Sequence, residues 1–126
     1  MSPVTQDIFF DDPQGRAGNC LQALVASITE KPLEEVPHFA AIEDASWFDQ
    51  TVEFLNKNGF NVYDCEIEEM LHVKNSFVWA SGPSPRGVHH CVLYQNGEMI
   101  HDPHPSGAGL VNITWCAVLI PKIVTN

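Results

Sequence analysis

A cysteine stands where a polar loop gives way to a predicted helix. Residues 14–21 read Gln-Gly-Arg-Ala-Gly-Asn-Cys-Leu, so Cys20 falls in the first helical turn, six residues after Gln14. The positive end of a helix and its free N–H groups favour a thiolate over a thiol. The N–H of Cys20 and the side-chain amide of Gln14 are candidate donors to a developing oxyanion. This segment alone fits an inert core cysteine equally well, because free cysteines are mostly buried.

A second segment supplies a base and a carboxylate. His89 and His90 open one predicted strand, Asp102 ends the next, and the Asn96-Gly97 pair between them is a strong hairpin signal. A thiol nucleophile needs an imidazole to hold its proton, and the imidazole needs a third group to orient it. A histidine on a sheet or an Asp-Pro turn is more often structural when either occurs alone. Together with the cysteine, they indicate nucleophilic catalysis.

The hairpin turn decides which histidine faces Asp102. A two-residue turn sets Cys91 opposite Asp102, on the face that carries His89. A three-residue loop that includes Gln95 sets His90 opposite Asp102 instead. Strand geometry leaves both registers open.

The elements that position these residues follow from periodicity. Apolar residues at helical spacing predict a helix from Cys20 to Lys31 with Asn19 as its cap, and a second from Ser46 to Asn58. A short turn is expected between these helices, at 33–36. The strands are expected at 60–67, 76–80, 88–94, 98–102 and 111–119. Helices followed by an antiparallel sheet define an α+β domain that spans residues 1–126.

Composition narrows the class of partner. Six Lys and Arg residues against sixteen Asp and Glu give a net charge of −10, which disfavours nucleic acid and anionic membranes. The first residues show no signal-peptide pattern, so we expect a cytoplasmic protein. The four cysteines are widely spaced without a C-x-x-C pair, and they are expected to be thiols. We expect neither a metal nor another cofactor, although His101, Asp102 and His104 lie close in sequence.

Five aromatic residues are expected to be core residues rather than a ligand platform: Trp47, Phe48, Phe54, Trp79 and Trp115. His101 and His104 are expected at the rim of the site. The acidic residues around Glu43 are expected to be solvated and to disfavour anionic substrates.

The two segments resemble the papain-like cysteine peptidase superfamily. The chain order Gln14, Cys20, His90, Asp102 matches that superfamily, as does the six-residue spacing from glutamine to cysteine. The run from His90 to Tyr94 and the Asp-Pro at Asp102 are most similar to bacteriocin-processing peptidases and small phage or bacterial relatives. The resemblance implies a papain-like fold, with N-terminal helices packed on a C-terminal antiparallel sheet. It also selects His90 over His89 as the base.

The resemblance implies a thiol-dependent hydrolase or acyl-transfer enzyme that acts on a peptide, isopeptide or amide bond. Cys20 is then the nucleophile, His90 the base, Asp102 the orienting carboxylate and Gln14 an oxyanion donor. The product of the first step is a thioester, resolved by water or by an amine. For a phage-encoded member, the place of action is the host cytoplasm. The alternative is a catalytically idle protein of the same fold that occludes a host or partner protein.

Overall fold

The computed structural model describes residues 1–123 and is an α+β domain, as the sequence predicts. Helix α1 spans Cys20–Thr29 and helix α2 spans Trp47–Lys57. Short 3-10 helices cover Leu33–Glu35 (η1), Phe39–Ala41 (η2) and Ile67–His72 (η3). The strands are β1 (Phe60–Asp64), β2 (Phe77–Pro83), β3 (His89–Gln95), β4 (Glu98–His101) and β5 (Trp115–Pro121).

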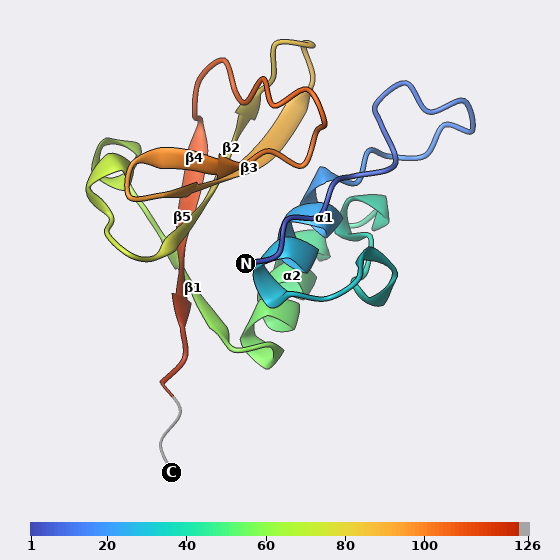
Figure 1. Cartoon of the computed structure of the whole chain (residues 1–126). Helices are drawn as coiled ribbons and strands as arrows, with labels where there is room; N and C mark the ends of the chain where they lie inside the picture. Colours follow the sequence, from blue (N-terminus) through green and yellow to red (C-terminus); the bar gives the residue numbers. More distant parts are fainter. Residues whose placement is uncertain (124–126) are drawn as a thin grey trace.

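The five strands form one antiparallel sheet in the order β1-β5-β2-β3-β4. The last strand is therefore inserted between the first two, and β3 lies between β2 and the edge strand β4 (Figure 1). The two segments that carry the candidate site residues meet because α1 packs on β3.

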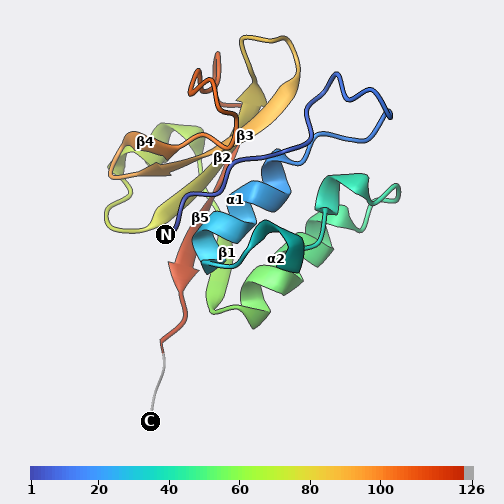
Figure 2. The ribbon, with the colours of Figure 1, turned by 45° about the vertical axis from the view of Figure 1, so that its right-hand side comes forward.

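Helices α1 and α2 lie on one face of the sheet, as Figure 2 shows. The main core cluster lies between these helices and the sheet. It includes Leu24, Leu55, Trp79, Leu93 and Leu119, all nearly inaccessible to solvent. Alternation along β3 directs Cys91 and Leu93 into this cluster and Val92 into a second one. That second cluster is closed by η3 and by residues 110 and 113. Both faces of the sheet are thus covered.

The helix ends have local causes. Helix α1 stops at Thr29 because Glu30 takes a left-handed conformation (φ 57°), ahead of Pro32. Helix α2 stops before Gly59, whose φ of 95° is accessible mainly to glycine.

The structure corrects several predicted features. Trp47 is 39% exposed instead of belonging to the core. The other four aromatic residues named above do lie in or against the main core cluster. The predicted segment 60–67 divides into β1 and the start of η3, and β5 begins only at Trp115 because residues 105–114 form a loop. Helices η2 and η3 carry no periodic apolar pattern long enough to be recognised in the sequence.

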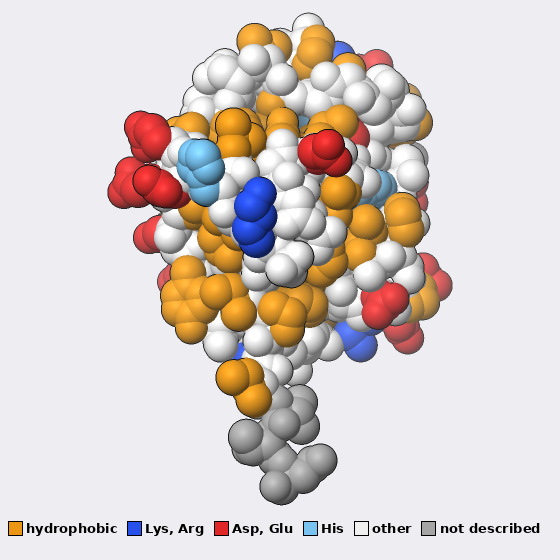
Figure 3. All heavy atoms as spheres, turned by 60° about the vertical axis from the view of Figure 1, so that its left-hand side comes forward, with side chains coloured by type: hydrophobic (Ala, Val, Ile, Leu, Met, Phe, Trp, Pro, Cys, Tyr) orange, Lys and Arg blue, Asp and Glu red, His pale blue; other side chains and the backbone are white. Residues whose placement is uncertain are grey.

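The outer side of the sheet carries both charged and hydrophobic side chains. On the side that Figure 3 shows, acidic side chains lie around the edge, with hydrophobic side chains between them. Within residues 1–123, no helix is long and apolar enough to cross a membrane.

Candidate active site

Cys20 is the first residue of α1, held there by the preceding asparagine. Asn19 occupies the N-cap position, as predicted, but its buried side chain makes no capping hydrogen bond to the helix. Its Oδ1 accepts the N–H groups of Asp7 (3.1 Å) and Ile8 (2.8 Å), and its Nδ2 donates to the Asp7 carboxylate (2.8 Å). These bonds tie the N-terminal segment to the start of α1. The N–H of Cys20 itself has no acceptor within the helix, as at every helix start.

His90 and Asp102 form a buried pair. His90 Nε2 lies 2.6 Å from Asp102 Oδ1, and the two side chains are 3% and 2% exposed. Asp102 also accepts the backbone N–H of His104 on Oδ1 and that of Gly109 on Oδ2, both at 2.9 Å. The carboxylate is therefore oriented by the loop that follows β4 as well as by the histidine.

A β-bulge explains how Asp102 reaches the His90 face. The turn is the two-residue type, with Asn96 and Gly97 both at positive φ and Gln95 paired with Glu98. That register alone would set Asp102 beside His89, as predicted for a two-residue turn. The structure differs because the register shifts by one residue after Tyr94, so that Leu93 pairs with His101. One extra residue in β4 moves every following side chain to the opposite face.

The electrostatics of the site favour a thiolate–imidazolium pair. Burial opposes a charge on His90, but its hydrogen bond to Asp102 and the nearby Cys20 raise the pKa of His90 to about 9. Burial likewise opposes a charge on Asp102, but His90 and the two backbone donors lower the pKa of Asp102 to about 2. At neutral pH the pair is therefore charged on both sides.

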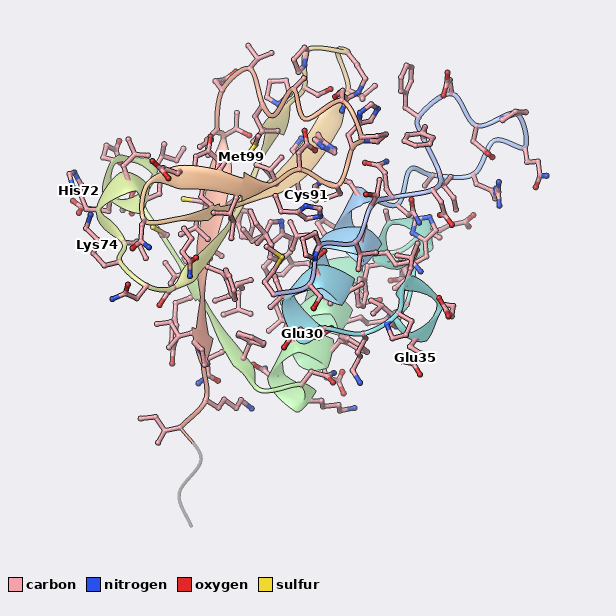
Figure 4. The ribbon with its side chains drawn as sticks, viewed as in Figure 1. Glu30, Glu35, His72, Lys74, Cys91 and Met99 are labelled. Atoms are coloured by element: carbon pink, nitrogen blue, oxygen red, sulfur yellow. The ribbon has the colours of Figure 1, made fainter. Side chains whose placement is uncertain are left out.

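Cys20 is in contact with a second thiol. Cys91 Sγ lies 3.3 Å from Cys20 Sγ, and Cys91 is buried (Figure 4). The hydrogen bond that Cys91 donates, followed by interaction with His90, holds the pKa of Cys20 well below its usual range, although burial opposes this. The same contact and burial raise the pKa of Cys91. Of the two thiols, Cys20 is the one that ionises.

The structure does not bring Gln14 to this site. Gln14 is exposed in the loop of residues 9–18, which projects from the domain (Figures 1 and 2). Asp12 closes this loop by accepting the backbone N–H groups of Gln14 and Arg16 and by pairing with the Arg16 side chain. The predicted donor therefore lies within the projecting loop instead of beside Cys20.

A different glutamine, Gln6, borders the site. It is 7% exposed and lines a cavity together with Cys20, His90 and His104. Its Nε2 donates to Ile8 O (2.9 Å), and its Oε1 is buried without a hydrogen-bond partner. The spacing in the sequence did not indicate Gln6, because it lies fourteen positions before Cys20. The backbone bond from Asn19 N–H to Ile8 O and the Asn19 side-chain bonds to Asp7 and Ile8 hold its segment beside the start of α1.

A larger cavity opens on the other side of Cys20. It has a volume of about 560 Å³ and reaches Cys20, His90 and Cys91 at one end. Its lining includes two indole rings, Trp47 and Trp79, and two acidic residues, Glu43 and Asp44, as well as small and aliphatic side chains. Trp47 thus contributes to this lining rather than to the core. His89 also lines this cavity, so both histidines border the site but only His90 contacts Asp102.

The two remaining histidines near the site differ in their positions. His104 lines the cavity shared with Cys20, which agrees with its expected place at the rim. His101 instead contacts Val4 O through Nε2 at 2.8 Å. Within residues 1–123, no three His, Cys, Asp or Glu side chains are grouped so that they could hold a metal ion.

Comparison with models of known protein families, with characterised proteins and with solved structures finds no match to this chain.

Proposed function

We propose that the protein is a thiol-dependent enzyme that cleaves or transfers an acyl group at a peptide, isopeptide or other amide bond. Cys20 is the nucleophile, His90 the general base and acid, and Asp102 the group that orients His90. The observation that carries the proposal is the buried 2.6 Å contact between His90 and Asp102, adjacent to a thiol at the start of a helix. The resemblance of both segments to papain-like cysteine peptidases supports the same assignment.

The reaction proceeds through a thioester. The Cys20 thiolate attacks the carbonyl carbon, and the π electrons of the carbonyl move to its oxygen. When the oxyanion collapses, the C–N bond breaks and the leaving amine takes a proton from the His90 imidazolium. Neutral His90 then removes a proton from water, which attacks the thioester and releases the acid and the thiolate. If an amine attacks instead of water, the outcome is acyl transfer.

Two donors are available for the oxyanion. The N–H of Cys20 points out of the first turn of α1 without an acceptor in the helix. The second donor is Gln6, which replaces Gln14 in this role because its amide is buried beside Cys20. Donors fixed in advance of the reaction are effective because they need no reorganisation as charge develops.

The large cavity favours apolar or cationic groups next to the scissile bond. Its indole rings offer apolar surface and can also stack on a cation, and Glu43 and Asp44 repel anions. With a volume of about 560 Å³, it accommodates a side chain or a short peptide segment.

The test is the rate at which Cys20 is alkylated by iodoacetamide, measured against pH by peptide mass spectrometry. In the wild type we expect rapid alkylation below about pH 6, far from the ordinary thiol value of about 8.5. His90→Ala should abolish this reactivity. Cys116 is the internal control, because burial raises the pKa of its thiol to about 12.

A second measurement follows the chemistry itself. Incubation with an activated ester such as p-nitrophenyl acetate should yield an acyl-protein by intact mass in the wild type, and none in Cys20→Ala. The proposal would be refuted if Cys20 were alkylated only near the pH of an ordinary thiol, equally in the wild type and in His90→Ala, and if no acyl-protein formed. That result would favour the alternative of a catalytically idle protein that occludes a partner.

A further inference from the structure

A second sulfur lies in contact with the proposed nucleophile. Cys91 follows His90 on β3 and points to the helix face of the sheet, where its Sγ is 3.3 Å from Cys20 Sγ. The acyl-transfer reaction assigns no bond-forming step to Cys91. Its neighbours in the core are apolar residues of α1 and β3, so a small apolar side chain would suffice for packing alone.

We propose that Cys20 and Cys91 form an oxidative modification site, at which a hydroperoxide oxidises Cys20 and Cys91 then closes a reversible intramolecular disulfide. This property goes beyond the proposed acyl transfer and does not depend on the identity of its substrate.

The first step consumes the peroxide. The Cys20 thiolate attacks the terminal oxygen of ROOH, the O–O bond breaks, and the alkoxide takes the proton of the His90 imidazolium to leave as ROH. Cys20 becomes a sulfenic acid and the peroxide is reduced by two electrons. Thiolates react in this way and thiols do not, so the attack falls on Cys20 rather than on the protonated Cys91.

The second step joins the two sulfurs. Cys91 attacks the sulfenic sulfur, an S–S bond forms, and the hydroxyl group leaves as water with the proton of Cys91. A disulfide has an S–S length of about 2.05 Å, so the two sulfur atoms need to approach by roughly 1.3 Å.

Two features favour formation of the Cys20–Cys91 disulfide: the access of peroxide to Cys20 and the contact between the two sulfur atoms. The cavity of about 560 Å³ is lined by both cysteines, so a small peroxide reaches Cys20 from solvent. Cys91 is already in contact with Cys20, so it reaches the sulfenic sulfur before a thiol that must diffuse in from solvent. The disulfide protects Cys20 from irreversible oxidation, because only the free sulfenic acid proceeds to sulfinic and sulfonic acids.

The chain contains a second pair of neighbouring cysteines, which serves as a comparison for Cys20 and Cys91. Cys65 and Cys116 are neighbours at the β1–β5 end of the sheet, where Cys116 Sγ donates to Cys65 O at 3.1 Å. Burial raises the pKa of Cys116 to about 12, so Cys116 is protonated at neutral pH. Proximity is common to both pairs, whereas the hydrogen bond from the second thiol and the contact with His90 lower the pKa of Cys20.

The experiment uses the full chain carrying Cys65→Ser, which removes the comparison pair without touching the site. The reduced protein is treated with hydrogen peroxide, quenched by alkylation and mapped by mass spectrometry. We expect a peptide that joins Cys20 to Cys91, lighter by two hydrogen atoms, and full recovery of Cys20 alkylation after dithiothreitol. The unmodified wild type should form the Cys20–Cys91 link before any Cys65–Cys116 link.

The matched variant is Cys91→Ser, which keeps a small hydrogen-bond donor but has no sulfur. In this variant we expect Cys20 to advance to sulfinic and sulfonic acid, with at least a tenfold loss of the thiol recoverable by dithiothreitol. Far-UV circular dichroism before oxidation checks that the variant is folded, and Cys91→Ala serves if it is not. Equal over-oxidation of Cys20 with and without Cys91, or linkage only between molecules, would overturn the proposal. The alkylation and acylation assays on reduced protein report on the proposed function separately.

Discussion

Asp102 Oδ1 lies 2.6 Å from His90 Nε2 because β4 contains one more residue than the opposing stretch of β3. Without the shift in register after Tyr94, the carboxylate would point to the His89 face. The bulge therefore selects the histidine. The backbone N–H of His104 donates to the same oxygen, Oδ1, and that of Gly109 donates to Oδ2, so both oxygens of the carboxylate are held.

Replacing Asp102 should affect stability and reactivity together. Asp102→Asn removes a buried negative charge that is hydrogen-bonded to His90 and to two backbone N–H groups. We expect the free energy of unfolding to fall by about 3 kcal/mol. Alkylation of Cys20 at pH 6 should slow by at least about tenfold, since His90 loses its orienting partner. Urea denaturation and the alkylation assay check both effects, and the exposed Asp64→Asn is the control that should change neither.

The pH dependence of stability should differ in shape between the wild type and Cys20→Ala. The raised pKa of His90 contributes stability that is fully present below pH 6.5 and is lost as the pH rises through about 9. The lowered pKa of Cys20 acts in the opposite sense: its contribution is present above pH 9.0 and is lost as the pH falls toward its folded pKa. As the pH rises from 6.5 to 9, the stability lost through His90 and the stability gained through Cys20 therefore largely cancel in the wild type.

Cys20→Ala removes one side of this balance. We expect its stability to fall as the pH rises above 6.5, by at most about 3 kcal/mol, whereas the wild type stays nearly level up to pH 9. Both proteins should lose the contribution of Asp102 as the pH falls from 3.8 through about 2. Urea titrations at closely spaced pH values measure these curves. Parallel curves above pH 6.5 would argue against a thiolate–imidazolium pair.

The two glutamines offer a direct comparison. Gln6→Ala should slow acylation by an activated ester roughly 100-fold, because it removes a donor beside the developing oxyanion. Its rate of alkylation should hardly change, because alkylation forms no oxyanion. Gln14→Ala should leave both rates unaltered, since Gln14 is exposed in the projecting loop. If acylation were slower in Gln14→Ala and unchanged in Gln6→Ala, Gln14 would be the oxyanion donor after all, as its spacing from Cys20 predicts.

The hydrogen bond between the thiols should be visible in the alkylation profile. Cys91→Ala removes the donor at 3.3 Å from Cys20, so the apparent pKa of Cys20 should rise and its alkylation at pH 6 should slow about tenfold. Cys91→Ser retains a donor and should stay close to the wild type. Identical profiles for all three proteins would mean that His90 alone sustains the thiolate.

Gly82 lies opposite His90 in the β2–β3 pair and tolerates no side chain. A Cβ at this position would come within 2.0 Å of Asn112 O, which belongs to the backbone and cannot rotate away. Gly82→Ala should lower the free energy of unfolding by about 1–3 kcal/mol. Gly18→Ala is the control, since its nearest new contact is an ordinary 3.5 Å. Thermal denaturation distinguishes the two variants.

Local sequence was sufficient for most of the elements. The apolar spacing after Cys20 and the stops at Lys31-Pro32 and Gly59 predicted both helices to within a few residues. The Asn96-Gly97 pair predicted the hairpin, whereas the choice between a two-residue and a three-residue turn was left to the structure. These features depend on interactions between near neighbours in the chain, namely caps, turns and periodic burial, so the sequence carries their signals directly.

The site depended on interactions that no local pattern encodes. The bulge in β4 reverses which face Asp102 occupies, and a one-residue shift leaves no mark in the hydrophobic pattern of so short a strand. The loop of residues 9–18 brings Gln6, not Gln14, to Cys20, because backbone and Asn19 bonds close the chain across it. The contact of Cys91 with Cys20 joins residues 71 positions apart. Sequence alone thus determined the elements and the types of reactive residue, whereas long-range packing decided which of those residues meet.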